Sequence, residues 1–148
     1  MENTPIRIML ADDDEADRLL FREAFKEMKI KSIVETVNDG IELMEYLLPM
    51  KKPMPHLLFL DLSMPRKNGL ECLIELRNNL AFKDLAIAIY STSASEKDIE
   101  DTYLKGANVY INKPNDFAKL KEVLQKAVMM THLYMEPPFN KDLFLLRV

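Results

Sequence analysis

Short apolar runs alternate along this chain with longer segments whose apolar residues recur every three or four positions. The runs are expected strands, and they lie at about 6–11, 33–37, 57–60, 85–90 and 109–112. The longer segments are expected helices, at about 15–29, 40–47, 69–77, 96–105 and 115–130. Short apolar runs of this kind suit strands that are covered on both faces. The alternation therefore predicts a doubly wound α/β domain, in which five helices flank a five-stranded parallel sheet.

Individual residues add detail to two of these expected helices. The first expected helix carries an apolar stripe of Leu20, Ala24, Phe25 and Met28, which we expect to face the sheet. Gly106 follows the fourth expected helix and is placed to end it in the left-handed conformation. These assignments are predictions of packing and carry no function.

Composition excludes several classes of protein. The 148 residues suit one domain, and 20 Lys and Arg against 24 Asp and Glu give a net charge of -4, which repels nucleic acid. The three glycines, Gly40, Gly69 and Gly106, lie too far apart for a glycine-rich nucleotide-binding loop. The N-terminus lacks the regions of a signal peptide, and no apolar run approaches the roughly 20 residues that span a bilayer. We expect a soluble, cytoplasmic protein with neither nucleic acid nor membrane as a partner.

Polar residues follow directly on the expected strands. Asp12 and Asp13 follow the first strand, Asp61 the third, Ser91 the fourth and Lys113 the fifth. In open α/β sheets, ligands bind at the carboxyl ends of the strands, so these side chains are expected to converge. Three converging carboxylates repel one another unless a cation joins them, and Mg²⁺ prefers such oxygen ligands. Lys113 would add a positive charge that attracts an anion, and Ser91 would add a hydroxyl donor. This set of residues suits phosphoryl transfer, in which an aspartate can itself be the nucleophile.

Each of these residues also has a simpler interpretation when taken alone. Acids at 12–14 are common at a helix N-terminus, and Asp61 could be a turn residue at a strand end. Tyr110 alone would be an ordinary strand aromatic. Their joint placement with Lys113 favours a site. Asp14, a third acid, would replace one of the pair if the register were shifted by one, but the length of the first strand favours Asp12 and Asp13.

Taken in order, the motifs resemble those of the receiver domains of two-component response regulators. The resemblance covers about residues 6–130, and its specificity lies in the ordered combination. The matching residues are Asp12-Asp13, Asp61 followed by Met64-Pro65 and Gly69, Ser91, Gly106-Ala107, Tyr110 and Lys113-Pro114. The strand order expected for this fold is 2-1-3-4-5.

The resemblance implies a role for each acid. Asp61 would accept a phosphoryl group from a histidine kinase or a phosphotransfer protein. Asp13 and Asp61 would bind Mg²⁺ directly, together with the backbone carbonyl of Ser63, and Asp12 would act nearby through water. Because the domain helps only its own modification, we do not expect an enzyme with turnover.

The resemblance also implies a switch. Lys113 would pair with the phosphoryl group, Ser91 would hydrogen-bond one of its oxygens, and Tyr110 would turn inward behind Ser91. The Lys113-Pro114 peptide is expected to be cis. The surface formed by strand 4, helix 4 and strand 5 would then change and signal to an unidentified downstream protein, directly or within a phosphorelay.

A C-terminal extension follows the expected domain. We place the receiver domain at residues 1–131 and the extension at 132–148, which includes the apolar run 143–146. The extension is too short for an output domain and too apolar for a solvated linker. Either it folds back on its own domain, or it packs on a second chain in a homodimer, as in receivers linked to phytochrome-like kinases.

Two other functions are considered. A metal-dependent phosphohydrolase with an aspartyl-phosphate requires a second aspartate two positions after the nucleophile, and Ser63 stands there instead. A phosphorylation-independent interaction module would share the fold but would not be labelled by a small phosphodonor.

Overall fold

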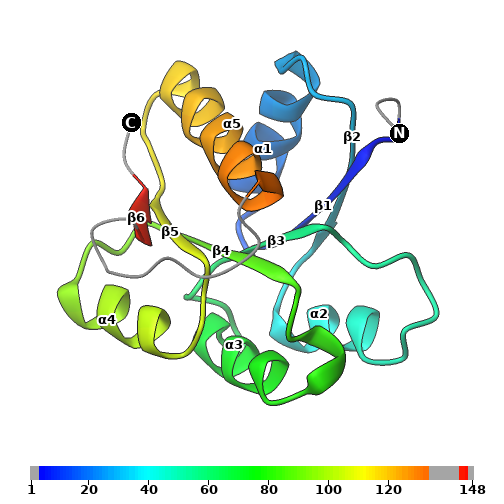
Figure 1. Ribbon diagram of the computed structural model, residues 1–148. Coiled ribbons are helices and arrows are strands. Elements are labelled where there is room, and N and C mark those ends of the chain that lie inside the picture. The colour runs from blue at the N-terminus through cyan, green and yellow to red at the C-terminus, as the bar shows by residue number, and fades with distance from the viewer. Residues whose placement is uncertain (1–3, 134–143, 147–148) are drawn as a thin grey trace.

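The computed structural model describes residues 4–133 and 144–146, which form one parallel sheet between two layers of helices (Figure 1). The strand order is β2-β1-β3-β4-β5-β6. The elements are β1 (Ile6–Ala11), α1 (Glu15–Glu27), β2 (Ser32–Val37), α2 (Gly40–Leu47), β3 (Leu57–Leu60), α3 (Gly69–Arg77), the 3₁₀ turn η1 (Leu80–Phe82), β4 (Ala86–Ser91), α4 (Glu96–Leu104), β5 (Val109–Asn112), α5 (Phe117–Leu133) and β6 (Leu145–Leu146).

The helices are divided between the two faces of the sheet. Figure 1 shows α1 and α5 on one face and α2, α3 and α4 on the other. Alternate residues of each strand point to opposite faces, so in β1 Ile8 and Leu10 face α1 and α5, and Met9 and Ala11 face the other layer. Both sets are fully buried, which is why positions 8–11 of β1 are all apolar. The prediction of a doubly wound α/β domain is confirmed.

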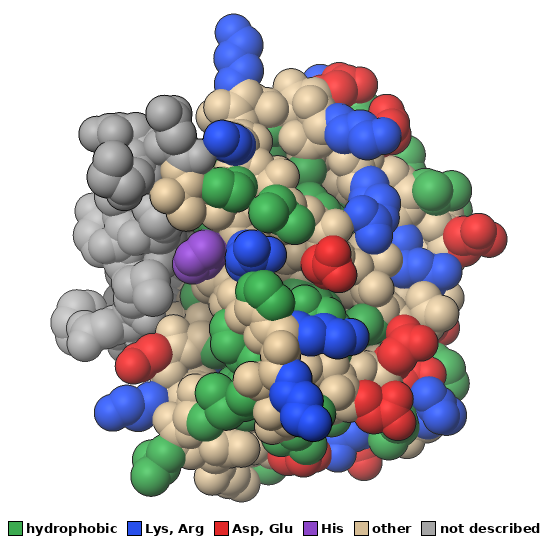
Figure 2. All heavy atoms as spheres, turned by 90° about the vertical axis from the view of Figure 1, so that its right-hand side faces the viewer, with side chains coloured by type: hydrophobic (Ala, Val, Ile, Leu, Met, Phe, Trp, Pro, Cys, Tyr) green, Lys and Arg blue, Asp and Glu red, His purple; other side chains and the backbone are tan. Residues whose placement is uncertain are grey.

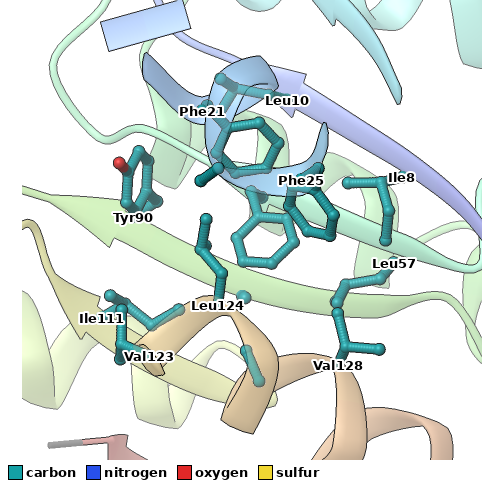
Figure 3. Close-up of a cluster of buried hydrophobic side chains, with 14 of the residues drawn as sticks. Ile8, Leu10, Phe21, Phe25, Leu57, Tyr90, Ile111, Val123, Leu124 and Val128 are labelled. Carbon is teal, nitrogen blue, oxygen red and sulfur yellow. The ribbon is translucent and has the colours of Figure 1, made fainter. Parts of the chain in front are cut away.

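Aromatic rings fill the layer between the sheet and α1. The rings of Phe21 and Phe59 lie 5.0 Å apart, edge to face, and Tyr90 packs on both. Figure 3 shows Phe21, Phe25 and Tyr90 within this cluster of buried side chains. The expected stripe of α1 was wrong in one position, because Leu20 is 47% exposed and Phe21 is buried in its place. A face through Phe21, Ala24, Phe25 and Met28 has the same helical spacing and buries a larger ring.

The expectation of five strands was wrong, because β6 pairs in parallel with β5 and makes a sixth. Tyr110 is opposite Leu145 and Ile111 is opposite Leu146. The edge of β5 would otherwise leave backbone groups unpaired, and the apolar segment at 144–146 covers it. A strand of two residues, such as β6, is too short to show an alternating or continuous apolar pattern in the sequence. The first five strands keep the predicted order, and residues 134–143 of the extension lie outside the described part.

Two further features of the described residues matter for function. Gly106 has a φ of 99°, so the predicted left-handed end of α4 is confirmed. Among the residues that the structure describes, none of the helices is both long enough and apolar enough to cross a bilayer. Figure 2 shows a face on which basic, acidic and hydrophobic side chains lie side by side.

Candidate phosphoryl-acceptor site

The site lies at the carboxyl ends of the strands and is held there by backbone hydrogen bonds that continue the sheet. The N–H of Asp12 donates to a β2 carbonyl at 3.1 Å, and that of Asp61 to a β1 carbonyl at 3.0 Å. The N–H of Lys113 donates to the carbonyl of Ser91 at 2.8 Å. Each functional side chain therefore leaves the sheet from a fixed backbone position, as the strand-end rule predicts.

Three carboxylates gather at this edge. Oxygen atoms of Asp12, Asp13 and Asp61 lie within 4.8 Å of one another. Asp12 and Asp61 are buried and Asp13 is exposed. Asp14 lies elsewhere, because it caps α1 and accepts a hydrogen bond from the N–H of Asp17 at 3.0 Å. The structure thus brings together the acids at 12, 13 and 61 and gives Asp14 a helix-capping position.

Lys113 reaches into the acidic cluster from the end of β5. Its Nζ lies 2.8 Å from Oδ2 of Asp12, 2.8 Å from Oδ2 of Asp17 and 3.6 Å from Oδ2 of Asp61. It also lies 5.1 Å from the ring centroid of Tyr90. The Lys113 side chain is only 9% exposed, so its charge acts in a medium that screens it weakly.

Burial and charge shift the pKa values of these groups. The pKa of Asp61 is raised to about 6, chiefly by burial and also by the charge of Asp12, although Lys113 opposes the shift. Burial also raises the pKa of Asp12, against the hydrogen bond from Lys113. The pKa of Lys113 is raised: burial opposes its charge, but the hydrogen bonds to Asp12 and Asp17 and the charges of Asp61 and Asp12 together outweigh burial. Additional positive charge would relieve the two buried carboxyl groups.

The donor set fits a hard divalent cation. Carboxylate oxygens within 4.8 Å of one another match the ligands and the spacing that Mg²⁺ takes, and two of the three acids are buried. The loop after β3 stays close to them, since the N–H of Ser63 lies 3.4 Å from Oδ1 of Asp61. Gly69 allows this approach, because a Cβ there would collide with the backbone carbonyl of Asp61.

Ser91 and Tyr110 lie beside this cluster on β4 and β5. Ser91 is buried, and its Oγ accepts a hydrogen bond from the N–H of Ser93 at 3.1 Å. The Tyr110 hydroxyl donates to the carbonyl of Ser93 at 2.9 Å, and its ring is fully buried. The tyrosine is therefore already turned inward. The expected cis peptide before Pro114 was wrong, since the bond is trans, the isomer that tertiary amides favour slightly.

Two acids near the site were missed by the sequence reasoning. Asp17 reaches Lys113 from α1, and the strand-end rule does not select residues on helices. Asp39 caps α2 and accepts two hydrogen bonds from Arg66, at 2.9 and 3.1 Å, which lower its pKa. Arg66 has a φ of 68° in the loop after β3. The Asp39–Arg66 pair thus ties that loop to α2, and the only signal for it was the Asn38-Asp39-Gly40 turn.

The fold is a doubly wound domain with five helices, and its strand ends carry an acid triad (Asp12, Asp13 and Asp61) and a lysine, Lys113. This combination is that of the receiver-type signalling domains. The family model of the response regulator receiver domain matches residues 8–125, and the chain belongs to this family. Its homologues are signalling proteins rather than enzymes, and they act in two-component phosphorelays.

Particular relatives are found by sequence and by structure. The chain is 31% identical to response regulator Rcp1 of Synechocystis, over 83% of this chain and 86% of the relative. It is 27% identical to a probable chemotaxis protein CheY of Rhizobium etli, over 81% and 90% of the two chains. The phosphorylated cyanobacterial phytochrome response regulator RcpA superposes with a TM-score of 0.79 at 30% identity, covering 93% of this chain and all of that one. Mn²⁺-bound Rcp1 gives 0.77 at 29%, over 88% and 96%.

Proposed function

We propose that Asp61 accepts a phosphoryl group from a histidine kinase or a phosphotransfer protein in the presence of Mg²⁺. The observation that carries this proposal is the convergence of one lysine and three carboxylates at the strand ends, with Lys113 3.6 Å from Asp61. Membership of the receiver family supports the same chemistry, because phosphoryl acceptance is general in that family.

Asp61 is the acid best placed to be the nucleophile. One of its oxygens, Oδ1, is 3.4 Å from the N–H of Ser63, and the other, Oδ2, faces Lys113. A carboxylate oxygen attacks phosphorus, the bond to the donor nitrogen breaks, and the donor histidine leaves with its electron pair. Ionised Asp61 is the reactive form, and its burial makes that form costly unless positive charge is added to that of Lys113.

The remaining residues bind and orient. Asp13 and Asp61 would hold Mg²⁺ with the backbone carbonyl of Ser63, and Asp12 would contribute through water. When bound, the metal neutralises charge on the transferred phosphoryl oxygens. Lys113 supplies a second positive charge to the same oxygens, and the Ser91 hydroxyl donates to one of them once it leaves Ser93.

A labelling experiment tests the function. The protein is incubated with acetyl phosphate and Mg²⁺, and intact mass is followed over time. We expect one phosphoryl group per chain in the wild type and none in Asp61→Asn. Asp14→Asn is the matched control, because it removes an adjacent acid that lies outside the acid triad.

The other two functions appear as distinct results of the same experiment. Steady release of inorganic phosphate over many turnovers would indicate a phosphohydrolase. The absence of labelling in the wild type would indicate a phosphorylation-independent interaction module. Equal labelling of wild type and Asp61→Asn would move the acceptor to another residue and overturn the assignment.

We further propose that the output surface is formed by β4, α4 and β5. Ser91 and Tyr110 are joined on this surface through the N–H and the carbonyl of Ser93, and Ser91 would respond to a phosphoryl group on Asp61. Because Rcp1 and RcpA are among the relatives at about 30% identity, and RcpA is a phytochrome response regulator, a phytochrome-type histidine kinase is the first donor to test. Lys113→Ala should allow some phosphorylation but uncouple it from partner binding.

The extension at 132–148 is proposed to complete the edge of β5, either in its own chain or from a second copy. Phe144 is fully buried against Tyr110 and Tyr103, so without the extension these two rings beside the edge of β5 would lose a packing partner. Light scattering on the full chain and on a chain ending at residue 135 distinguishes the two arrangements. A dimer mass that is lost on truncation favours the exchanged arrangement, and a monomer mass in both excludes it.

A further inference from the structure

We infer that Asp17 is a positioning residue for Lys113, whose ammonium it holds toward Asp61. The inference deepens the proposed function and rests on it, because it specifies how the cation of that same site is held. The contact that carries it is the 2.8 Å distance between Oδ2 of Asp17 and Nζ of Lys113. Asp17 lies on α1, far from Lys113 in the sequence.

The number of N–H donors on the Lys113 ammonium shows why this contact matters. A lysine ammonium has three N–H donors at tetrahedral angles. Two of them are used, since both Asp12 and Asp17 accept hydrogen bonds at 2.8 Å. Asp61 lies at 3.6 Å, beyond hydrogen-bond distance, so one donor is left for a group attached there. The ring of Tyr90 lies on a further side of Lys113 and limits its movement.

The two anchors of Lys113 differ in what else they do. Asp12 belongs to the acid triad with Asp13 and Asp61, so its charge is shared with any cation held by that triad. Asp17 lies outside the triad, so a cation held there would not compete with Lys113 for its carboxylate. Asp17 would therefore remain an anchor of Lys113 if Asp12 were drawn toward a metal ion.

Local structure fixes Asp17 on the correct side of the site. It lies in the first turn of the 13-residue helix α1, and its N–H donates to the capping carboxylate of Asp14 at 3.0 Å. Its side chain is 31% exposed, so solvent screens part of the attraction to Lys113. We therefore expect removal of the Asp17 carboxylate to have a moderate effect on the reaction.

The test compares Asp17→Ala with Glu15→Ala. Glu15 is an exposed acid in the same turn, so its removal changes the net charge and takes an acid from the first turn of α1 to the same extent. At saturating Mg²⁺, acetyl phosphate should label Asp61 in Asp17→Ala about five to twenty times more slowly than in Glu15→Ala, the loss typical of a charge-assisted contact. Asp17→Glu should recover part of the rate, and Mg²⁺ affinity should change by less than about threefold between the two alanine variants.

A second background separates positioning from a general effect on the fold. In Lys113→Met there is no ammonium to position, so adding Asp17→Ala should change the labelling rate by less than about twofold. An equal slowing by Asp17→Ala in both backgrounds would overturn the inference. So would identical rates for Asp17→Ala and Glu15→Ala in the wild-type background.

Failure of the proposed function is seen separately. The Lys113 ammonium resonance in ¹H–¹⁵N spectra reports its hydrogen bonds without any phosphodonor. We expect its protons to exchange with water at least about fivefold faster in Asp17→Ala than in Glu15→Ala, because one anchoring acceptor is gone. If wild-type protein is never labelled, the phosphoryl-acceptor function fails while this measurement still decides the positioning. Unchanged exchange in Asp17→Ala would overturn the positioning even if labelling succeeds.

Discussion

The ring of Phe144 packs edge to face on the ring of Tyr110, with centroids 6.1 Å apart and an interplanar angle of 62°. Both residues are fully buried, and the Tyr110 hydroxyl donates to Ser93 beside Ser91. Phe144 also packs on Tyr103 of α4 at 5.3 Å. The segment that adds β6 to the sheet thus contacts the same tyrosine that is proposed to respond to the state of Asp61.

This contact predicts a loss of stability in Phe144→Ala. The substitution removes a buried ring from between Tyr110 and Tyr103, and Phe-to-Ala changes in cores cost about 3–5 kcal/mol. Because the segment lies at the sheet edge and can detach locally, we expect a smaller decrease in the free energy of unfolding, about 1–3 kcal/mol. Urea denaturation followed by circular dichroism measures it.

Leu80→Ala is the control for this loss. Leu80 is 85% exposed, so its truncation should change the free energy of unfolding by less than about 0.5 kcal/mol. If Phe144→Ala and Leu80→Ala unfold at the same urea concentration as the wild type, the packing of β6 against β5 contributes nothing in solution.

Tyr110→Phe isolates the hydroxyl from the ring. The variant keeps the packing on Phe144 and loses the 2.9 Å hydrogen bond to the carbonyl of Ser93. We expect a decrease in the free energy of unfolding of about 1 kcal/mol, the usual net contribution of such a bond. Denaturation of both proteins at one pH measures it, and a variant as stable as the wild type would mean that the bond is compensated by water.

The strands and the helix layers could be predicted because both signals are local. β1 is apolar apart from Arg7 and β3 is apolar throughout, and they are followed at once by Asp12 and Asp61, respectively. The sixth strand could not be predicted, since β6 has two residues and depends on the open edge of β5. Leu20 and Phe21 are adjacent and both apolar, so periodicity could not tell which of them faces the sheet.

The candidate site was predictable to the extent that strand ends define it. The cluster of Asp12, Asp13 and Asp61 with Lys113 follows from a parallel sheet and the positions of these residues in the chain. Asp17 was not predictable by that rule, because its contact depends on the side-chain direction one turn into α1. The contacts of Lys113 with Asp12 and Asp17 depend on how α1 and β5 are placed in space, which local sequence patterns do not give.

The raised pKa of Asp61 predicts a pH-dependent gain in stability for Asp61→Asn. The pKa is about 6 in the folded protein and 3.8 without perturbation, so the unfolded chain ionises first and the folded state loses stability as pH rises from about 4 to 6. Asn cannot ionise. At pH 7.5 without Mg²⁺, the variant should be more stable than the wild type by up to about 3 kcal/mol.

The same comparison at low pH is the control. At pH 4 the Asp61 side chain of the folded protein is largely neutral, so the two proteins should differ by less than about 1 kcal/mol. Urea denaturation in EDTA at both values measures the two differences. A difference that stays the same at pH 4 and 7.5 would show that burial does not make ionised Asp61 costly.

Gly69→Ala tests whether the loop after β3 must approach Asp61 closely. Gly69 begins α3, a position where alanine would ordinarily stabilise a helix by up to about 1 kcal/mol. Here the added Cβ would collide with the backbone carbonyl of Asp61 and with Leu62, neither of which can rotate away. We expect the opposite sign, a loss of at least about 2 kcal/mol in the free energy of unfolding, as for other overpacked cores. The loop should also shift, so Mg²⁺ affinity measured by calorimetry should fall together with stability. A Gly69→Ala protein that is more stable than the wild type and binds Mg²⁺ equally well would show that the close approach is not needed to form the site.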